Sequence, residues 1–130
     1  MTIEQEIHTQ AEAAKAASYP LAALPPGIRN DALCAMAQAL TDCRAVILQA
    51  NAADMEEAAA AGMKSSYLDR LHLDDARIEG MAEGLRLTAG LPDPLGREDF
   101  SVRRPNGLEI RRLRVPLGVI GIIYEARPNV

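Results

Sequence analysis

The feature that most restricts the fold is an uninterrupted apolar run at residues 119–124, Val-Ile-Gly-Ile-Ile-Tyr. A run without polar alternation is typical of a strand covered on both faces, as in a parallel sheet flanked by helices. Neither a crossover helix nor a second parallel strand follows in the sequence. We therefore expect an α/β fold in which this segment is the first strand of an incomplete parallel sheet, within the N-terminal part of a longer protein. If the chain's own residues buried this segment completely, the interpretation as part of a larger sheet would be wrong.

Most of the preceding residues follow helical spacing. Residues 3–18 predict a first helix, which Pro20 should end. A second helix should follow Pro25-Pro26, and its apolar stripe has steps of three and four residues: Leu33, Met36, Leu40, Cys43 and Ile47. Asn51 resembles the N-cap of a third helix over residues 52–61, and Gly62 should end that helix.

A further helix should begin at Asp74-Asp75 and end at Gly90. Its predicted apolar stripe is Ile78, Met81, Leu85 and Thr88. Gly80 and Gly84 lie four positions apart in this helix, and each costs about 1 kcal/mol relative to alanine. We expect a neighbouring element to pack closely against them.

The pattern changes near residue 98, where extended segments replace helical ones. Pro105-Asn106-Gly107 between two extended runs is a strong hairpin signal. Along the second strand the apolar side chains change face, which predicts a β-bulge at Arg111-Arg112. The chain therefore divides into a helical part (residues 1–97), a β-ribbon (98–115) and the first parallel strand with its loop (116–130).

The charges and the hydropathy exclude several classes of protein. The formal net charge is −4 and the pI is about 5.2, whereas a nucleic-acid-binding surface needs a basic footprint. The longest uncharged apolar stretch, residues 115–124, is too short to cross a bilayer, and the N-terminus lacks the pattern of a secretion signal. We expect a soluble, cytoplasmic protein.

The sequence contains no recognisable metal or dinucleotide motif. Cys34 and Cys43 fall on opposite faces of one predicted helix, and His8 and His72 are isolated, so we expect two packed thiols, two surface imidazoles and no metal site. The glycines of Gly118-x-x-Gly121 precede or lie within the predicted strand. A Rossmann fingerprint instead opens the helix that follows its strand, so this motif is not predicted.

Four segments resemble a known family. Residues 114–130, Arg-Val-Pro-Leu-Gly-Val-Ile-Gly-Ile-Ile-Tyr-Glu-Ala-Arg-Pro-Asn-Val, resemble the segment that marks the gamma-glutamyl phosphate reductase (glutamate-5-semialdehyde dehydrogenase) family of the aldehyde dehydrogenase superfamily. Residues 50–54, 91–96 and 104–108 are also similar to that family. The resemblance covers nearly the whole chain in the expected order, helices first and ribbon second.

The resemblance implies an enzyme of proline biosynthesis that reduces gamma-glutamyl phosphate to glutamate 5-semialdehyde with NADPH and releases phosphate. In this family the nucleophilic cysteine lies beyond position 130, so the 130 residues alone are expected to be inactive. In the superfamily the corresponding ribbon helps to form the oligomer interface. The resemblance therefore implies a homo-oligomer and an interfacial role for the ribbon arginines at positions 103, 104, 111, 112 and 114.

The resemblance also implies roles for residues near the end of the sequence. Asn129 corresponds to an asparagine whose side-chain amide helps to stabilise an oxyanion, which makes it the expected catalytic residue; an asparagine in an ordinary turn is the open alternative. The backbone at Tyr124 and Glu125 corresponds to the region that lines the cofactor cleft, here for NADP. Arg127 suits a phosphate or carboxylate of the substrate or cofactor, but an ordinary ion pair is the favoured alternative.

Two other functions stay open. One is a non-catalytic helical interaction module whose ribbon and terminal strand add to a partner's sheet. The other is a different acyl-reducing member of the same superfamily. A continuing α/β pattern with a cysteine nucleophile after residue 130 would argue against the interaction module.

Overall fold

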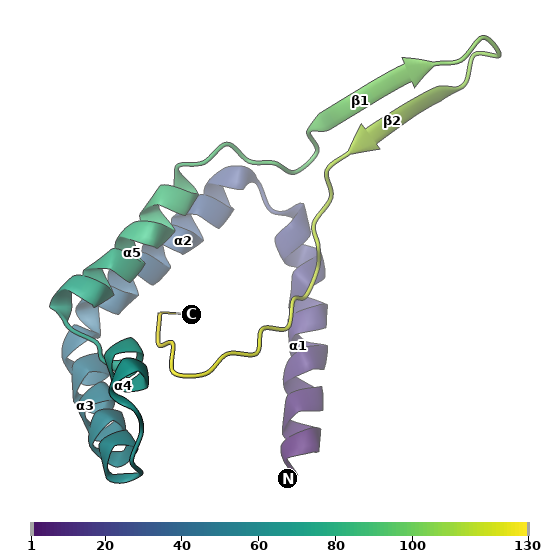
Figure 1. Ribbon diagram of the computed structural model, residues 1–130. Coiled ribbons are helices and arrows are strands. Elements are labelled where there is room, and N and C mark those ends of the chain that lie inside the picture. Colours follow the sequence, from purple (N-terminus) through teal and green to yellow (C-terminus); the bar gives the residue numbers. More distant parts are fainter. Residues whose placement is uncertain (1, 130) are drawn as a thin grey trace. The chain divides into compact units, whose positions relative to one another are not determined.

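The computed structural model describes residues 2–129, which form five helices followed by a two-stranded antiparallel hairpin (Figure 1). The expected class is confirmed: N-terminal helices and a hairpin of an incomplete α/β fold. Residues 27–91 and 122–129 make one compact unit, and residues 2–26 and 92–121 make the other. The elements are α1 (Ile3–Ala23), α2 (Pro26–Asp42), α3 (Arg44–Ala60), α4 (Ser65–Leu71), α5 (Asp75–Ala89), β1 (Glu98–Arg103) and β2 (Glu109–Leu113).

Helix α1 is longer than the sequence predicts. Its start is a capping box, in which the Thr2 hydroxyl accepts a hydrogen bond from the Gln5 backbone N–H at 3.2 Å and the Gln5 side chain accepts one from the Thr2 N–H at 3.0 Å. The prediction that Pro20 ends this helix is wrong, because α1 continues through Pro20 to Ala23. A proline has no backbone N–H, so it removes one hydrogen bond of the helix. Pro20 lies in the last turn of α1, where this loss leaves the preceding turns intact.

The boundary between the second and third helices lies at Cys43, a single residue that separates α2 from α3. The prediction of a helix start at Asn51 is wrong. Asn51 lies inside α3 and is 6% exposed; its side-chain amide donates to the Leu71 carbonyl at 2.8 Å and its Oδ1 accepts from the Leu73 N–H at 2.7 Å. Its polar groups therefore bind the connection between α4 and α5 instead of capping its own helix.

Two predicted helix boundaries are confirmed. Gly62, at φ 77°, follows α3, and two backbone N–H groups after the helix donate to its last carbonyls in a Schellman arrangement. At the start of α5, the Asp74 carboxylate accepts a hydrogen bond from the Arg77 backbone N–H at 2.7 Å. These two caps fix where the chain turns before and after α4.

The core lies in the unit of residues 27–91 and 122–129. It is small and is filled mainly by alanine, because the sequence contains few aromatic residues. Ile78 is the largest fully buried side chain. The apolar residues that are buried are Ala37, Ala58, Leu73, Ile78, Ala82 and Ala89. The predicted stripe of α5 is therefore only partly a core stripe, because Thr88 is exposed and Met81 and Leu85 are half-buried.

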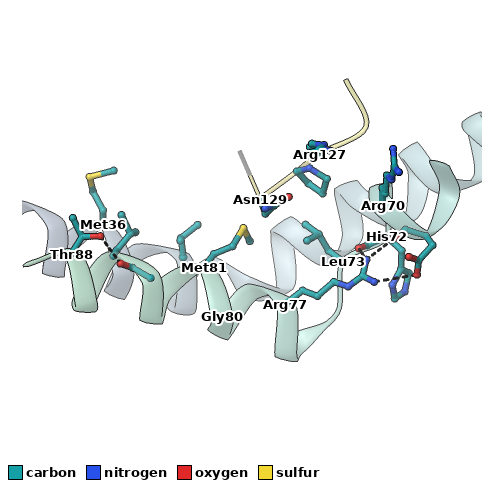
Figure 2. A pocket seen from close by; sticks show the side chains of 15 residues that line it. Met36, Arg70, His72, Leu73, Arg77, Gly80, Met81, Thr88, Arg127 and Asn129 are labelled. Carbon is teal, nitrogen blue, oxygen red and sulfur yellow. Dashed lines mark hydrogen bonds and ion pairs between the residues drawn. The ribbon is translucent and has the colours of Figure 1, made fainter. Parts of the chain in front are cut away.

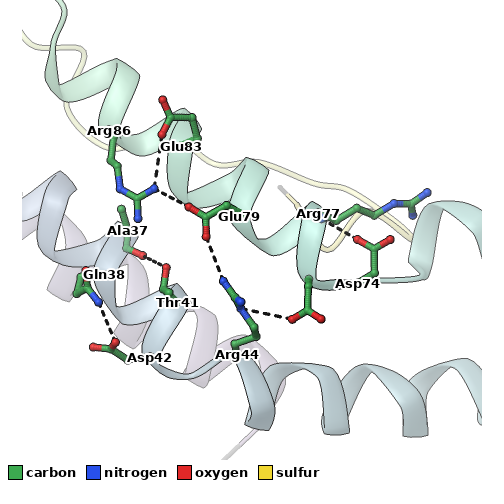
Figure 3. A network of polar contacts seen from close by, with 11 residues as sticks. Ala37, Gln38, Thr41, Asp42, Arg44, Asp74, Arg77, Glu79, Glu83 and Arg86 are labelled. Carbon is green, nitrogen blue, oxygen red and sulfur yellow. Dashed lines mark hydrogen bonds and ion pairs between the residues drawn. The ribbon is translucent and has the colours of Figure 1, made fainter.

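A polar network joins the start of α3 to α5 (Figure 3). Glu79 accepts hydrogen bonds from Arg86 at 2.8 Å and from Arg44 at 3.0 Å. The hydrogen bond from Arg86 is the main reason that the pKa of Glu79 is lowered, and Arg44 lowers it further. The Arg44 Nε is buried 3.5 Å from the Asp75 carboxylate without a hydrogen bond among residues 2–129. Because the carboxylates are exposed to solvent, these ion pairs add little to the free energy of unfolding. Their main effect is to orient α5 relative to the start of α3.

The hairpin forms where predicted, but its irregularity lies on the opposite strand. Arg103 pairs with Glu109 beside the turn, where Gly107 adopts φ 85°. The bulge predicted at Arg111-Arg112 is not observed; the register instead shifts on β1, at Asp99. The apolar side chains of β2 change face because β1 has one extra residue, Asp99, opposite them. That residue also binds Arg114, whose Nε donates to the Asp99 carboxylate at 2.9 Å.

The apolar segment at residues 119–124 has no hydrogen-bonded neighbour among the described residues, and the structure contains no strand there. Its side chains are exposed, Ile122 by 66% and Tyr124 by 58%. The first parallel strand expected here is therefore not formed among the described residues, because no second strand lies beside the segment to exchange backbone hydrogen bonds with it. Just after it, Ala126 adopts φ 48°, a left-handed conformation that is uncommon for a residue with a side chain.

Candidate functional site

An open groove of about 880 Å³ runs along α5, within the unit of residues 27–91 and 122–129 (Figure 2). Helix α2 and the connection between α4 and α5 contribute to it, and so do the last described residues of the chain. Its apolar lining consists of Met36, Leu40, Leu73, Met81 and Leu85. Part of the stripe that the sequence predicts as core thus faces an open groove.

The backbone of α5 is accessible in the groove at Gly80 and Gly84. A Cβ added at either glycine would meet nothing within 4 Å, so the close packing predicted there is not observed among the described residues. The Thr88 hydroxyl, also in the lining, donates to the Gly84 carbonyl at 2.8 Å. The spacing of the two glycines was the signal in the sequence for this surface, although it does not reveal that the surface is open.

One end of the groove is polar. Arg77 is held by α4 and by the residue that follows it: it donates to the backbone carbonyls of Asp69 and His72, and its Nη2 lies 3.1 Å from the Asp69 carboxylate. Arg70 packs on the Tyr67 ring, with its guanidinium carbon 5.6 Å from the ring centre. The sequence reasoning missed these residues, because their positions follow from how α4 meets α5 and not from any motif.

Asn129 and Arg127 line this groove together, and Figure 2 draws both above α5. Neither side chain has a hydrogen bond or an ion pair within residues 2–129, so the favoured ion pair of Arg127 is not observed in this part of the chain. Tyr124 and Glu125 are exposed and do not line the groove. Of the residues singled out near the end of the sequence, the structure brings together Asn129 and Arg127. An amide donor and a guanidinium would suit an anionic or developing oxyanionic group.

Neither cysteine belongs to this site. Cys34 and Cys43 are exposed free thiols, so the prediction that they are packed is wrong: Cys34 lies on an uncovered part of α2, and Cys43 lies at the junction between α2 and α3. The expected surface position of His8 and His72 is confirmed. Within residues 2–129, no three potential metal ligands are grouped together, and no helix has the length and hydropathy needed to span a membrane.

Comparison with known proteins identifies close relatives over the full length of the chain. No family model matches. The chain is 50% identical over 130 residues to a gamma-glutamyl phosphate reductase of Geobacter metallireducens and 52% identical over 130 residues to that of Heliobacterium modesticaldum. The chain is homologous to part of gamma-glutamyl phosphate reductase. In each case all of this chain is covered, but it spans only 31% of the relative.

Two solved structures support the same relationship. The gamma-glutamyl phosphate reductase of Thermotoga maritima matches 95% of this chain with a TM-score of 0.89 and 41% identity, over 30% of its own length. The enzyme of the same name from Saccharomyces cerevisiae matches 89% of this chain with a TM-score of 0.77 and 29% identity, over 29% of its length. The helices and hairpin described above are thus similar to the N-terminal part of a gamma-glutamyl phosphate reductase.

Proposed function

We propose that this chain is the N-terminal part of an enzyme of proline biosynthesis that reduces gamma-glutamyl phosphate to glutamate 5-semialdehyde with NADPH and releases phosphate. The observation that carries the proposal is the 50% identity over all 130 residues to a gamma-glutamyl phosphate reductase. The complete enzyme is proposed to be a cytoplasmic homo-oligomer whose interface includes the hairpin. In support, the hairpin exposes large apolar side chains, among them Phe100, Ile110 and Leu113.

Asn129 is the proposed catalytic residue of this part of the chain. Reduction of an acyl phosphate passes through species in which negative charge develops on the acyl oxygen, and a side-chain amide stabilises that charge without losing a proton. Two observations support the role: Asn129 lines the groove, and its amide is not engaged by any residue in the described range. Arg127, beside it in the groove, is proposed to attract the substrate's phosphate or carboxylate.

The described residues do not by themselves make a site for NADP. Tyr124 and Glu125 are exposed and do not line the groove. NADP would supply the hydride in the complete enzyme. Within this chain, the contribution of Tyr124 and Glu125 is proposed to be limited to one wall of the cofactor cleft.

A chimeric enzyme tests the function. The 130 residues replace the matching segment of the Geobacter metallireducens relative, and phosphate-dependent reduction of NADP by glutamate 5-semialdehyde is measured. We expect turnover by the chimera and none by the 130 residues alone, since the family's nucleophile lies outside them. A folded chimera without turnover would contradict the proposal and favour a non-catalytic interaction module.

Substitution of Asn129 in the same chimera tests its role. Asn129→Asp keeps the shape of the side chain but replaces a donor by a negative charge, so we expect kcat to fall by about 10²–10³-fold. Gln49→Ala, which removes an exposed amide from α3, is the control and should leave kcat unchanged. If Asn129→Asp retains full kcat, Asn129 is an ordinary turn residue.

A further inference from the structure

The groove along α5 has an apolar surface that the described residues leave uncovered. Met36 of α2 is 55% exposed, and Met81 and Leu85 of α5 are only half-buried although the sequence places them on an apolar stripe. These side chains lie on two different helices and share one groove. Contiguous apolar surface of this kind is typical of a surface that another polypeptide segment covers.

Gly80 and Gly84 give that surface a particular shape. They lie one helical turn apart in the lining, and a Cβ at either position would meet nothing within 4 Å. Glycine lowers helix stability relative to alanine, and no contact in this unit requires it at these positions. A backbone that approaches α5 closely would require it, because a side chain there would hold the approaching segment away.

The end of the described chain lies in the same groove. Arg127, Pro128 and Asn129 all line it, and Figure 2 draws Asn129 and Met81 in the same opening. The chain spans 31% of the length of its gamma-glutamyl phosphate reductase relatives, and it matches their N-terminal part. In a complete reductase, the polypeptide that follows would therefore emerge inside the groove.

We propose that the segment following residue 130 in the complete reductase packs into this groove, with its backbone against Gly80 and Gly84 and apolar side chains against Met36, Met81 and Leu85. This docking would hold the loop with Arg127 and Asn129 in place between α5 and the next part of the enzyme. The inference rests on the proposal that the chain is part of a complete reductase. Its test measures packing and does not use turnover.

The test compares alanine variants in the isolated chain and in the chimera described above. In the isolated chain, Gly80→Ala and Gly84→Ala should raise the thermal midpoint by a few degrees, because alanine favours the helix and has room. In the chimera, the same substitutions should lower it, because each new methyl group meets the docked segment. Gly27→Ala in α2 is the matched control: it also has open space and lies outside the groove, so its effect should have the same sign in both proteins.

A second measurement does not depend on stable variants. Oxidation of methionines by peroxide, followed by mass spectrometry, should be several-fold slower at Met36 and Met81 in the chimera than in the isolated chain. Met63, which is outside the groove, is the internal reference. Equal oxidation of Met36 and Met81 in both proteins, or a higher midpoint for Gly84→Ala in both, would overturn the inference. A folded chimera without turnover that still protects Met36 and Met81 would contradict the proposed function alone.

Discussion

Asn51 shows how one buried polar side chain can organise a small helical unit. Its amide group donates to Leu71 and accepts from Leu73, so it satisfies two backbone groups in the connection between α4 and α5. Leu73 is buried, and an unpaired backbone N–H in such a position is costly. The side chain thereby positions the start of α5, which carries the groove.

Replacement of Asn51 should therefore destabilise the unit much more than replacement of an exposed amide on the same helix. Asn51→Leu leaves a buried donor and acceptor unsatisfied, and we expect a loss of roughly 1–3 kcal/mol in the free energy of unfolding. Urea denaturation followed by circular dichroism measures it. Gln49→Leu, an exposed amide on the same helix, should have little effect. Equal effects of the two substitutions would show that the hydrogen bonds of Asn51 contribute nothing specific.

At the scale of elements, the hairpin depends on a carboxylate at its base. Asp99 lies at the register shift and accepts hydrogen bonds from Arg114, which is the main reason that its pKa is lowered; Arg97 and Arg112 lower it further. A carboxylate with a lowered pKa stabilises the folded state fully above its unfolded pKa, and this contribution is lost as the pH falls through the folded value.

We therefore expect the hairpin to be insensitive to pH above the ordinary aspartate value of 3.8 and to loosen as the pH falls below it. Exchange of the Arg114 amide hydrogen, which is bonded to the Arg97 carbonyl at 3.0 Å, reports the change by NMR. Asp99→Asn should weaken this end of the hairpin above pH 3.8, where the wild-type carboxylate is ionised, and should remove the pH dependence. A wild-type profile that Asp99→Asn leaves unaltered would assign the acid sensitivity to another group.

The same elements indicate how far the sequence alone could predict the structure. The Gly62 and Asp74 caps and the Asn106-Gly107 turn were predictable, because each depends on residues close together in the chain. The burial of Asn51 and the bulge at Asp99 were not, because each involves a partner far along the chain, Leu73 for Asn51 and Arg114 for Asp99. The groove was only suggested, by the spacing of its two glycines.

At the scale of the whole molecule, the proposed homo-oligomer depends on the hairpin. Reversing the charge of both Arg111 and Arg112 to glutamate in the chimera should shift it toward smaller species, which size-exclusion chromatography with light scattering can detect. Arg111 also pairs with Glu109 at 2.9 Å, so each single variant should be compared with the double variant. Unchanged assembly would place the interface elsewhere, and a wild-type chimera that elutes as a monomer would contradict the oligomer itself.

The two thiols provide a practical route to following the α2–α3 region. Cys34 and Cys43 are the only cysteines of the sequence and both are exposed, so fluorescent or spin labels can be attached without engineering. One label would sit within α2 and the other at the residue where α2 gives way to α3. The label at Cys43 then reports, through its mobility or emission, how the junction between α2 and α3 responds when the chain is joined into the chimera, and the label at Cys34 reports on α2 alone.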